Sequence, residues 1–338
     1  METVESSHPV APSLLRRIKA YRVTAREIQG FLSKQPQEWG RFQSLFNFEV
    51  NGVFREIMNF EKENLGKGNE EGVYKLKHLF IRRLRPEFLH GELITWSLKK
   101  PFGYAGDYKV IDDIYLISPK TSGFDRLFDN YFQMSAISVA VRNRKEDFKK
   151  LVLRTLERSE GKAVRVMNLG SGPCRELAEL SSNKLLDRPP VTFDCYDNDE
   201  RAHAYARKLL GPLPNINYVK ENVVRLALKK DILAALPHRY DLIYSCGLFD
   251  YLDDRVSARL IGNLGRLLKD GGQLSISDVR DKYANPSVHF MEWVGDWSLI
   301  YRDDDNFRQL FLEGGFEESD LTIEYEQQGI MQYITASR

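Results

Sequence analysis

The sequence has few cysteines and no long apolar run. Its three cysteines, Cys174, Cys195 and Cys246, lack the close spacing of metal sites, and their odd number argues against a disulfide framework. No stretch approaches the 18 or more apolar residues of a membrane-spanning helix. The first residues, 1–5, are acidic and polar, unlike the basic and apolar regions of a secretory signal. We therefore expect a cytoplasmic protein that is not inserted in a membrane.

Neither sign of charge dominates the chain. Lys plus Arg number 49 and Asp plus Glu 48, so the formal net charge is +1. A nearly neutral chain without a basic stripe interleaved with aromatic residues gives no reason to expect nucleic acid as a partner. A small molecule is the expected partner, and the sequence does not indicate an oligomeric state.

The two halves of the chain differ in their apolar spacing. Within residues 1–155, apolar residues recur every three or four positions, which predicts several helices, the last a long one over 132–156. After Gly161, short strand-like runs alternate with helices, a pattern typical of a mostly parallel sheet. The strands are expected at 164–169, 191–196, 216–220, 241–246, 273–278, 321–325 and 331–335. We predict an α/β fold: a Rossmann-like, seven-stranded sheet in residues 156–338, and an N-terminal helical cap domain in residues 1–155.

A glycine-rich turn follows the first of these strands. Gly170, Ser171 and Gly172 lead into a helix that is expected to begin near Arg175. Glycines let the backbone turn tightly and approach a ligand, and the helix N-terminus offers unpaired N–H groups. A dinucleotide motif has a third glycine where this chain has Cys174, which disfavours NAD. By itself the motif is weak, since an ordinary turn also explains it.

Polar residues follow the next three strands. Asp197, about 20 residues beyond the turn, is placed to accept both hydroxyls of a ribose, with Asn198 beside it. Asp199 is expected to cap the following helix. Asn222 follows the third strand, where its amide can pair with an adenine edge, and Ser245 lies at the end of the fourth. Because ligands bind at the carboxyl ends of parallel strands, these loops are expected to converge on one crevice.

In motif order and spacing, residues 161–338 resemble the class I S-adenosylmethionine (SAM)-dependent methyltransferase family. The resemblance implies that SAM is the cofactor, with its methionine end at Gly170 and Gly172. It also places the ribose at Asp197 and the adenine at Asn222, while Ser171, Asn198 and Ser245 complete the expected binding set. The chain departs from the family pattern at Cys174, where glycine is frequent, and at Asn222, where aspartate is usual.

One segment of the helical half is unusual. Residues 100–108 combine two glycines, a proline and three aromatic residues, a composition that favours an ordered loop over a ligand. With residues 140–144, this segment resembles a bacterial group of SAM methyltransferases linked to 3-hydroxy fatty acid methyl esters. An interdomain core containing Tyr104 and Tyr108 is the structural alternative.

If this segment closes the site, the chemistry of SAM gives the candidate catalytic residues their roles. An aromatic face stabilises the SAM sulfonium by about 0.5–2 kcal/mol, which is the role expected of Tyr104 and Tyr108. Arg142 or Arg144 is a candidate for binding a substrate carboxylate, with Asn143 between them, although surface or interdomain ion pairs explain the arginines equally well. Positioning and exclusion of water would then supply most of the rate acceleration.

Two further segments have competing explanations. His289 lies in an aromatic segment and is a candidate general base for an alcohol or amine acceptor, but such a histidine is more often packed and hydrogen-bonded. The acidic run 303–305 is better explained as a helix start than as a metal site.

We expect a SAM-dependent methyltransferase for small-molecule biosynthesis. The first alternative is a SAM-consuming cyclase of the same fold, related to azetidine-2-carboxylate synthases, which releases methylthioadenosine. The second is a SAM-binding module without turnover. The sequence does not identify the methyl acceptor or the pathway.

Overall fold

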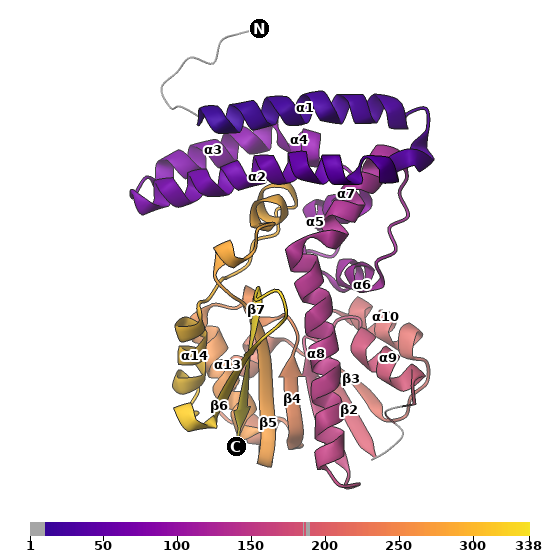
Figure 1. The fold of residues 1–338 in the computed structure, drawn as a ribbon. Helices are drawn as coiled ribbons and strands as arrows, with labels where there is room; N and C mark the ends of the chain where they lie inside the picture. Colours follow the sequence, from indigo (N-terminus) through magenta and orange to yellow (C-terminus); the bar gives the residue numbers. More distant parts are fainter. Residues whose placement is uncertain (1–10, 185, 187–189) are drawn as a thin grey trace. The chain divides into compact units, whose positions relative to one another are not determined.

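The computed structural model describes residues 11–184, 186 and 190–338 (Figure 1). Residues 1–5, on which the expectation about a secretory signal rests, lie outside this part of the chain. The chain divides into two compact units that alternate along the sequence. The helical unit consists of residues 1–106, 117–138 and 285–298, and the sheet unit of residues 107–116, 139–284 and 299–338.

The helical unit is built from amphipathic helices around an aromatic core. α1 and α2 lie side by side in it (Figure 1). Phe54 of α2 packs edge-on against Phe80, Phe88 and Phe290, with ring centroids 5.1–5.9 Å apart. The elements are α1 (Pro12–Leu32), η1 (Pro36–Arg41), α2 (Gln43–Gly66), α3 (Glu70–Arg83), α4 (Arg85–Phe88), α5 (Glu92–Lys99), α7 (Gly123–Met134) and the π-helix η4 (Phe290–Val294).

The sequence boundary predicted at residues 155 and 156 falls inside α8 (Ala136–Arg158). The compact units are not continuous halves, because residues 285–298 return to the helical unit. There Trp293 packs on Phe80, and its carbonyl accepts a hydrogen bond from Arg85 Nε at 2.9 Å. Apolar spacing along the chain does not reveal this exchange, since a buried aromatic segment is compatible with either unit.

A seven-stranded sheet with the order β3-β2-β1-β4-β5-β7-β6 forms the centre of the sheet unit. β1 to β5 are parallel neighbours, whereas β7 is antiparallel to both β5 and β6. The strands are β1 (Val164–Leu169), β2 (Val191–Asp197), β3 (Ile216–Lys220), β4 (Tyr240–Ser245), β5 (Leu268–Val279), β6 (Leu321–Tyr325) and β7 (Met331–Ser337). The predicted α/β class, with a Rossmann-like and mostly parallel sheet, is confirmed, as is the C-terminal hairpin.

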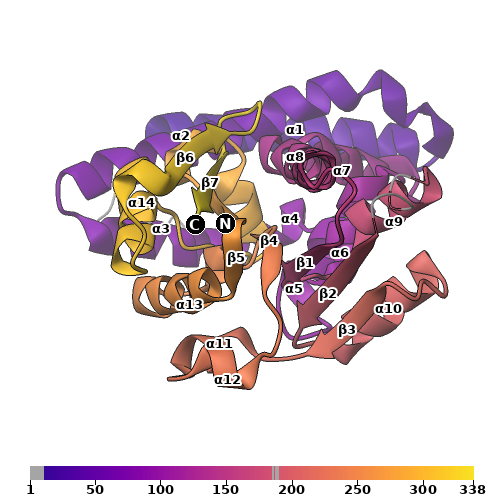
Figure 2. The same cartoon turned by 90° about the horizontal axis from the view of Figure 1, so that it is seen from below.

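Helices cover both faces of this sheet. In Figure 2, α8 and α9 (Arg175–Ser182) lie on one face, and α13 (Asp254–Arg266) and α14 (Asp304–Glu313) lie on the other. Leu260, Ile261, Phe307 and Phe311 pack with strand residues in one buried cluster on the second face. The remaining elements are α6 (Tyr108–Leu116), α10 (Glu200–Leu210), α11 (Val223–Leu228), α12 (Ile232–Ala235), η2 (Phe249–Tyr251), η3 (Lys282–Ala284) and η5 (Glu318–Asp320).

The single long helix predicted over 132–156 is present as α8, but it begins only at Ala136, because the chain breaks at Ser135 between α7 and α8. Ser135 is extended, with φ −61° and ψ 149°. Its hydroxyl donates to Phe132 O and lies 3.4 Å from the N–H of Ser138, so a local side-chain contact replaces the helical pattern. The apolar residues keep their helical spacing across the break, which conceals it in the sequence.

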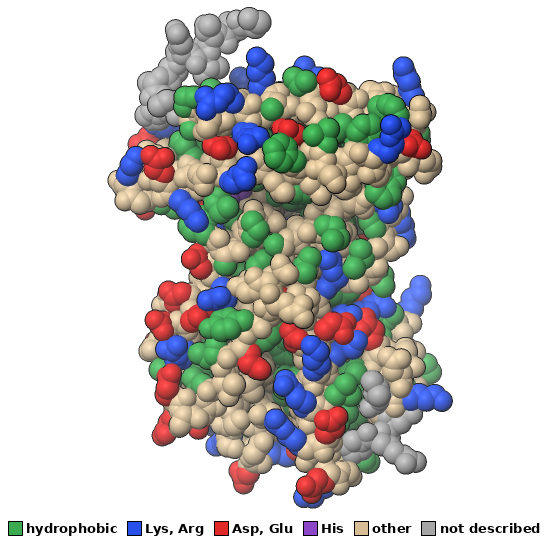
Figure 3. Space-filling view, in the orientation of Figure 1, with side chains coloured by type: hydrophobic (Ala, Val, Ile, Leu, Met, Phe, Trp, Pro, Cys, Tyr) green, Lys and Arg blue, Asp and Glu red, His purple; other side chains and the backbone are tan. Residues whose placement is uncertain are grey.

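Lys and Arg side chains are interspersed with Asp and Glu over the face drawn in Figure 3. Within residues 11–184, 186 and 190–338, no helix is both long and apolar enough to cross a membrane.

Candidate cofactor and substrate site

The glycine-rich turn occupies the carboxyl end of β1. Gly170 and Gly172 have φ values of +67° and +51°, in the left-handed region that glycine tolerates. A Cβ at Gly172 would meet no atom within 4 Å, so the space beside this residue is open. The N–H groups of Gly170 and Ser171 both donate to Tyr196 O, at 2.8 and 3.0 Å, which ties the turn to β2. The result is an ordered turn with open space beside Gly172.

Cys174 also takes a left-handed conformation, with φ +51° and ψ 37°, at the N-terminus of α9. This is the position at which the family resemblance expects glycine. The side chain is fully buried, so its packing offsets part of the roughly 1–2 kcal/mol that a left-handed non-glycine residue costs. The departure from the family pattern therefore changes the residue but retains the backbone turn.

Asp197 faces this turn from the end of β2. Its carboxylate accepts a hydrogen bond from Gly172 N–H at 2.9 Å and another from Asp199 N–H at 2.9 Å. Burial raises the pKa of Asp197, and these two backbone hydrogen bonds oppose the rise. Two neighbouring strand ends are thereby joined at the crevice where open α/β sheets bind ligands.

The other predicted cofactor residues have different surroundings. Asn198 is exposed next to Asp197. Asn222 is also exposed, and its side-chain oxygen caps α11 by accepting from Val224 N and Arg225 N. Ser245 is buried, and its hydroxyl donates to Leu169 O at 2.8 Å. Asp199 caps α10, as predicted.

A buried carboxyl group lies behind the turn. Glu176, in the first turn of α9, accepts hydrogen bonds from Asn168 Nδ2 at 2.8 Å and from Tyr244 Oη at 3.0 Å. Burial raises its pKa. Glu176 thus links β1, β4 and α9 from within the protein and supports the turn.

The unusual segment 100–108 contains residues of both units. Tyr104, at its centre, belongs to the helical unit and is 36% exposed. Asp107 is buried in the sheet unit, where its Oδ1 accepts from the N–H groups of Lys109 and Val110 and so caps α6. Tyr108 begins α6, and its ring lies 5.3 Å from that of Tyr205. The segment therefore ends in a helix that is part of the sheet unit.

The polar residues of α8 make separate contacts. Arg142 is half-buried and lies 3.4 Å from Ile114 O, and burial lowers its pKa. Asn143 donates to Glu326 Oε2 at 3.0 Å, in the connection between β6 and β7. Both residues lie in the sheet unit, and their catalytic roles stay predictions.

Arg144 is a buried cation with an incomplete set of partners. It is 5% exposed, and its closest carboxylate is that of Asp250, with Nη1 and Oδ2 3.8 Å apart. Within the described part of the chain, its Nε has no hydrogen-bond partner. A Cβ at Gly247 would lie 2.6 Å from Nη1, so glycine leaves space for the guanidinium at the exit of β4. A buried donor without a partner is costly unless a ligand satisfies it.

His289 belongs to the helical unit and is fully buried. Its Nε2 lies 3.1 Å from Glu61 Oε2, and its ring packs edge-on against Trp293. These contacts match the packed, hydrogen-bonded alternative, and the general-base role stays a prediction.

The acidic run before α14 begins that helix. The side chain of Asp303 accepts from Asn306 N–H and is the N-cap. In the range that the structure describes, no cluster of His, Cys, Asp and Glu residues is suited to a metal ion. The capping explanation of residues 303–305 is confirmed.

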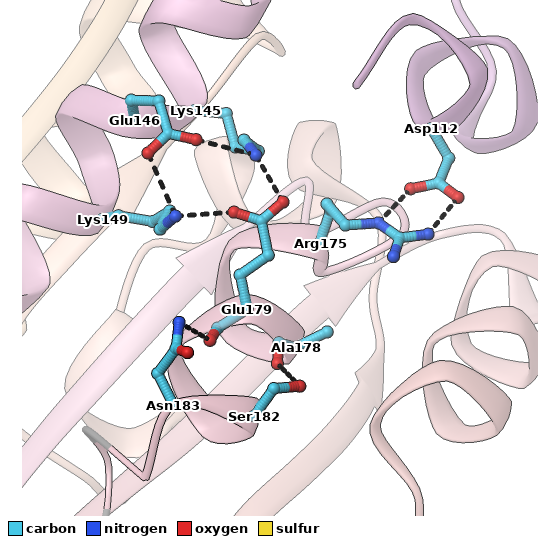
Figure 4. Close-up of polar contacts among 9 residues, drawn as sticks. All are labelled: Asp112, Lys145, Glu146, Lys149, Arg175, Ala178, Glu179, Ser182 and Asn183. Carbon is cyan, nitrogen blue, oxygen red and sulfur yellow. Dashed lines mark hydrogen bonds and ion pairs between the residues drawn. The ribbon is translucent and has the colours of Figure 1, made fainter. Parts of the chain in front are cut away.

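A buried ion pair beside the glycine-rich turn is not among the residues predicted from the sequence. Asp112 of α6 is fully buried and accepts from Arg175 Nε at 2.7 Å and from Arg175 Nη2 at 2.6 Å (Figure 4). Tyr205 of α10 donates to the same carboxylate. Arg175 directly follows Cys174, so its place next to the glycine-rich turn could have indicated that it supports the turn. Nothing in the sequence links Asp112 to it, as 63 residues separate the two.

Comparison with known proteins supports the fold. No family model matches the chain, and no curated protein matches it. A protein described as possibly exported, from Bordetella parapertussis, aligns with 18% identity and a TM-score of 0.55 over 98% of this chain and 99% of its own. Magnesium protoporphyrin IX methyltransferase (ChlM) from Synechocystis PCC 6803, with bound SAM, aligns with 12% identity and a TM-score of 0.42 over 60% of this chain and 83% of its own. The N-methyltransferase NodS from Bradyrhizobium japonicum WM9 aligns with 14% identity and a TM-score of 0.38 over 58% of this chain and 96% of its own. At these identities, only the likeness to the Bordetella protein carries weight, and it concerns the fold alone.

Proposed function

We propose that this protein is a SAM-dependent transferase that methylates a small molecule bearing a carboxylate. The single observation that carries the proposal is the hydrogen bond between Gly172 N–H and Asp197 at the carboxyl ends of β1 and β2. It sets a carboxylate beside a glycine turn with open space, an arrangement suited to a nucleoside with an amino-acid arm. Cytoplasmic location belongs to the same proposal.

The residues present fit SAM better than they fit NAD. Gly170 and Gly172 both adopt the left-handed conformation of the turn, Gly172 leaves open space beside it, and Asp197 offers carboxylate oxygens for ribose hydroxyls. The third glycine that a pyrophosphate would need is replaced by the buried Cys174. When bound, SAM would supply an electrophilic methyl group on a sulfonium.

Arg144 supports the choice of a carboxylate acceptor. Its Nε has no partner, and the nearest carboxylate is 3.8 Å away, so the guanidinium retains the capacity to bind an anion. Asp250 Oδ1 accepts from Val279 N–H at 2.9 Å, and its Oδ2 lies 3.8 Å from Arg144, beyond hydrogen-bond distance. The buried Arg144 is therefore a better candidate for the acceptor carboxylate than the half-buried Arg142.

The chemistry requires little acid–base assistance. A carboxylate oxygen is already a nucleophile, so it can attack the methyl carbon while the carbon–sulfur bond breaks and S-adenosylhomocysteine (SAH) leaves. The work of the chain is then to hold the two reactants in line and to exclude water. Tyr108 would place an aromatic face near the sulfonium.

Product analysis tests the proposal. The purified protein is incubated with SAM alone and with SAM plus short- and medium-chain carboxylic acids, and products are identified by liquid chromatography and mass spectrometry. SAH together with a methyl ester supports the proposal. Methylthioadenosine with a cyclic amino acid, formed without any acceptor, would instead establish the cyclase. Tight SAM binding without any product would indicate a binding module, and absence of SAM binding would refute all three.

The Arg144→Met variant tests the acceptor assignment. It should lose most turnover of carboxylic acids while binding SAH as the unmodified protein does. Arg154→Met is the matched control, because Arg154 lies on the same helix and is exposed. Equal turnover in the two variants would remove Arg144 from the acceptor site.

A further inference from the structure

Helix α6 is an isolated insertion in the sheet unit. The residues before it, up to Gly106, and those after it, from Ile117, belong to the helical unit. The nine residues Tyr108–Leu116 are therefore held in the sheet unit by their own contacts. The question is which contacts hold them and what they act on.

The strongest contact is the Asp112–Arg175 pair. The carboxylate is fully buried, and both oxygens accept from the planar guanidinium at 2.6 and 2.7 Å. Hydrogen bonding to Asp112 raises the pKa of Arg175. Bidentate pairs of this kind fix orientation as well as distance. Removing either partner leaves the other as an unpaired buried charge, so separating the two residues costs free energy.

The pair joins α6 to the proposed cofactor turn. Arg175 is the first residue of α9 and follows Cys174, whose backbone is left-handed. On α6, Asp112 lies four residues after Tyr108 and so shares its helix face. Both residues contact Tyr205 of α10, Asp112 through the phenol hydroxyl and Tyr108 through the ring.

A second ionic cluster holds the middle of α9. Glu179 lies one helical turn after Arg175 and pairs with Lys145 and Lys149 of α8, the latter at 2.6 Å (Figure 4). Glu146 pairs with the same two lysines. Since α9 is already attached to α8 through Glu179, Asp112 is not needed to keep α9 on the sheet. Its distinct effect is on α6 and on the first turn of α9.

Resting on the SAM-dependent function proposed above, we propose that Asp112 is a positioning residue of the cofactor site. It binds Arg175, and through this pair it sets α6 and Tyr108 against the turn that begins α9. The pair thus couples the glycine-rich turn to an aromatic helix that is distant in sequence. Asp112 itself touches no reactant, so its effect on the reaction passes through Tyr108.

The first test measures SAH affinity by calorimetry. Asp112→Asn keeps the shape of the side chain but removes the charge, and we expect SAH affinity to fall tenfold or more. Arg175→Lys keeps the charges but loses the bidentate geometry, and a similar fall is expected. Tyr205→Phe is the matched control: it removes one hydrogen bond to the same carboxylate but leaves the ion pair, and should change affinity less than threefold.

A double-mutant cycle separates positioning from stability. If Asp112 acts through Tyr108, the combined Asp112→Asn and Tyr108→Ala variant binds SAM, which carries the sulfonium, little more weakly than Tyr108→Ala alone. Fully additive losses would overturn the proposal. So would an Asp112→Asn variant that melts earlier yet binds SAH normally, since Asp112 would then be structural only.

Hydrogen exchange, measured on the unliganded protein, tests the role of Asp112 separately from the proposed SAM-dependent function. Failure of the unmodified protein to bind SAM or SAH would refute the proposed function. Independently, Asp112→Asn should accelerate exchange over residues 108–116 and 170–176 together, while residues 254–266 of α13 remain unchanged. Unaltered protection of α6 in that variant would overturn the role of Asp112, whatever the cofactor.

Discussion

The N–H of Gly172 donates a hydrogen bond to the carboxylate of Asp197 at 2.9 Å, across the ends of two parallel strands. A second N–H, that of Asp199, binds the other carboxylate oxygen at 2.9 Å. The carboxylate is thus held in one orientation before any ligand arrives. Pre-arranged groups of this kind improve binding by lowering the entropy that a ligand must overcome.

Replacing Asp197 with alanine should weaken SAH binding tenfold or more, because both the proposed ribose partner and the anchor of Gly172 are lost. Calorimetry measures the affinity, and circular dichroism checks that the fold remains. Asp231→Ala is the control: Asp231 caps α12, so its loss should cost about 1 kcal/mol of stability without changing affinity. Equal SAH affinity in Asp197→Ala and the unmodified protein would remove the ribose assignment.

Tyr104→Ala tests the expectation from the sequence that Tyr104 stabilises the sulfonium: on that expectation, turnover slows more than SAM binding weakens. Steady-state kinetics with an acceptor that the enzyme methylates gives the turnover, and calorimetry with SAM gives the affinity. Tyr74→Ala is a suitable control, since Tyr74 is exposed on α3. A Tyr104→Ala enzyme with an unchanged rate would make the segment 100–108 scaffold only.

Cys174→Gly should leave stability within about 1 kcal/mol of the unmodified protein. Glycine relieves a left-handed conformation worth roughly 1–2 kcal/mol, but it forfeits the buried side chain and increases the entropy of the unfolded chain. Cys174→Val retains bulk while opposing φ +51°, so it should destabilise by more than about 2 kcal/mol. Urea unfolding of both variants measures the difference, and equal stabilities would contradict the strain argument.

Glu176→Gln should change how stability depends on pH. Burial raises the pKa of Glu176 in the folded protein, so the folded state holds a proton that the unfolded state releases. Its favourable contribution is therefore complete below the ordinary carboxyl range and declines as pH rises toward the folded pKa. Glutamine cannot ionise, so relative to the unmodified protein the variant should gain stability as pH rises from the ordinary carboxyl range toward the folded pKa. Melting curves across that range measure the trend, and parallel pH profiles would refute it.

Arg302→Met should destabilise the protein by about 3–5 kcal/mol, because it leaves buried acceptors unpaired. Arg302 is 2% exposed, pairs with Asp278 at 3.0 Å and also donates to Phe249 O and Leu252 O. The matched surface pair is Arg280 with Asp304, where Arg280→Met should cost at most about 1 kcal/mol. Similar losses in the two variants, measured by denaturant unfolding, would contradict the role of burial.

Local sequence patterns predicted the sheet well because strand identity depends on short apolar runs between turn residues. β1, β3 and β6 have the predicted bounds, and the other strands differ at their ends. The break at Ser135 escaped prediction, since a hydroxyl bonding to nearby backbone leaves the apolar periodicity intact. Helix caps such as Asp199 and Asp303 were predictable because capping is local chemistry.

For the site, sequence placed Gly172 and Asp197 at adjacent strand ends, and the structure adds the bond between them. The sequence could not show which arginine of α8, Arg142 or Arg144, is the better candidate for binding a substrate carboxylate. Only packing shows that Arg144 is buried beside Gly247 with an unpartnered Nε, whereas Arg142 is half-buried. Burial depends on what other segments cover, which no single stretch of sequence contains.

The sequence by itself determined the order of strands and helices, the glycine-rich turn and the acidic residue that follows β2, because these depend on residues close together in the chain. Tertiary structure alone decided that α6 and residues 285–298 each join the unit opposite to their neighbours in sequence. It also decided that Asp112 meets Arg175 across 63 residues. Such pairings arise when distant side chains bury their charges and rings together, and their energy is absent from any local pattern.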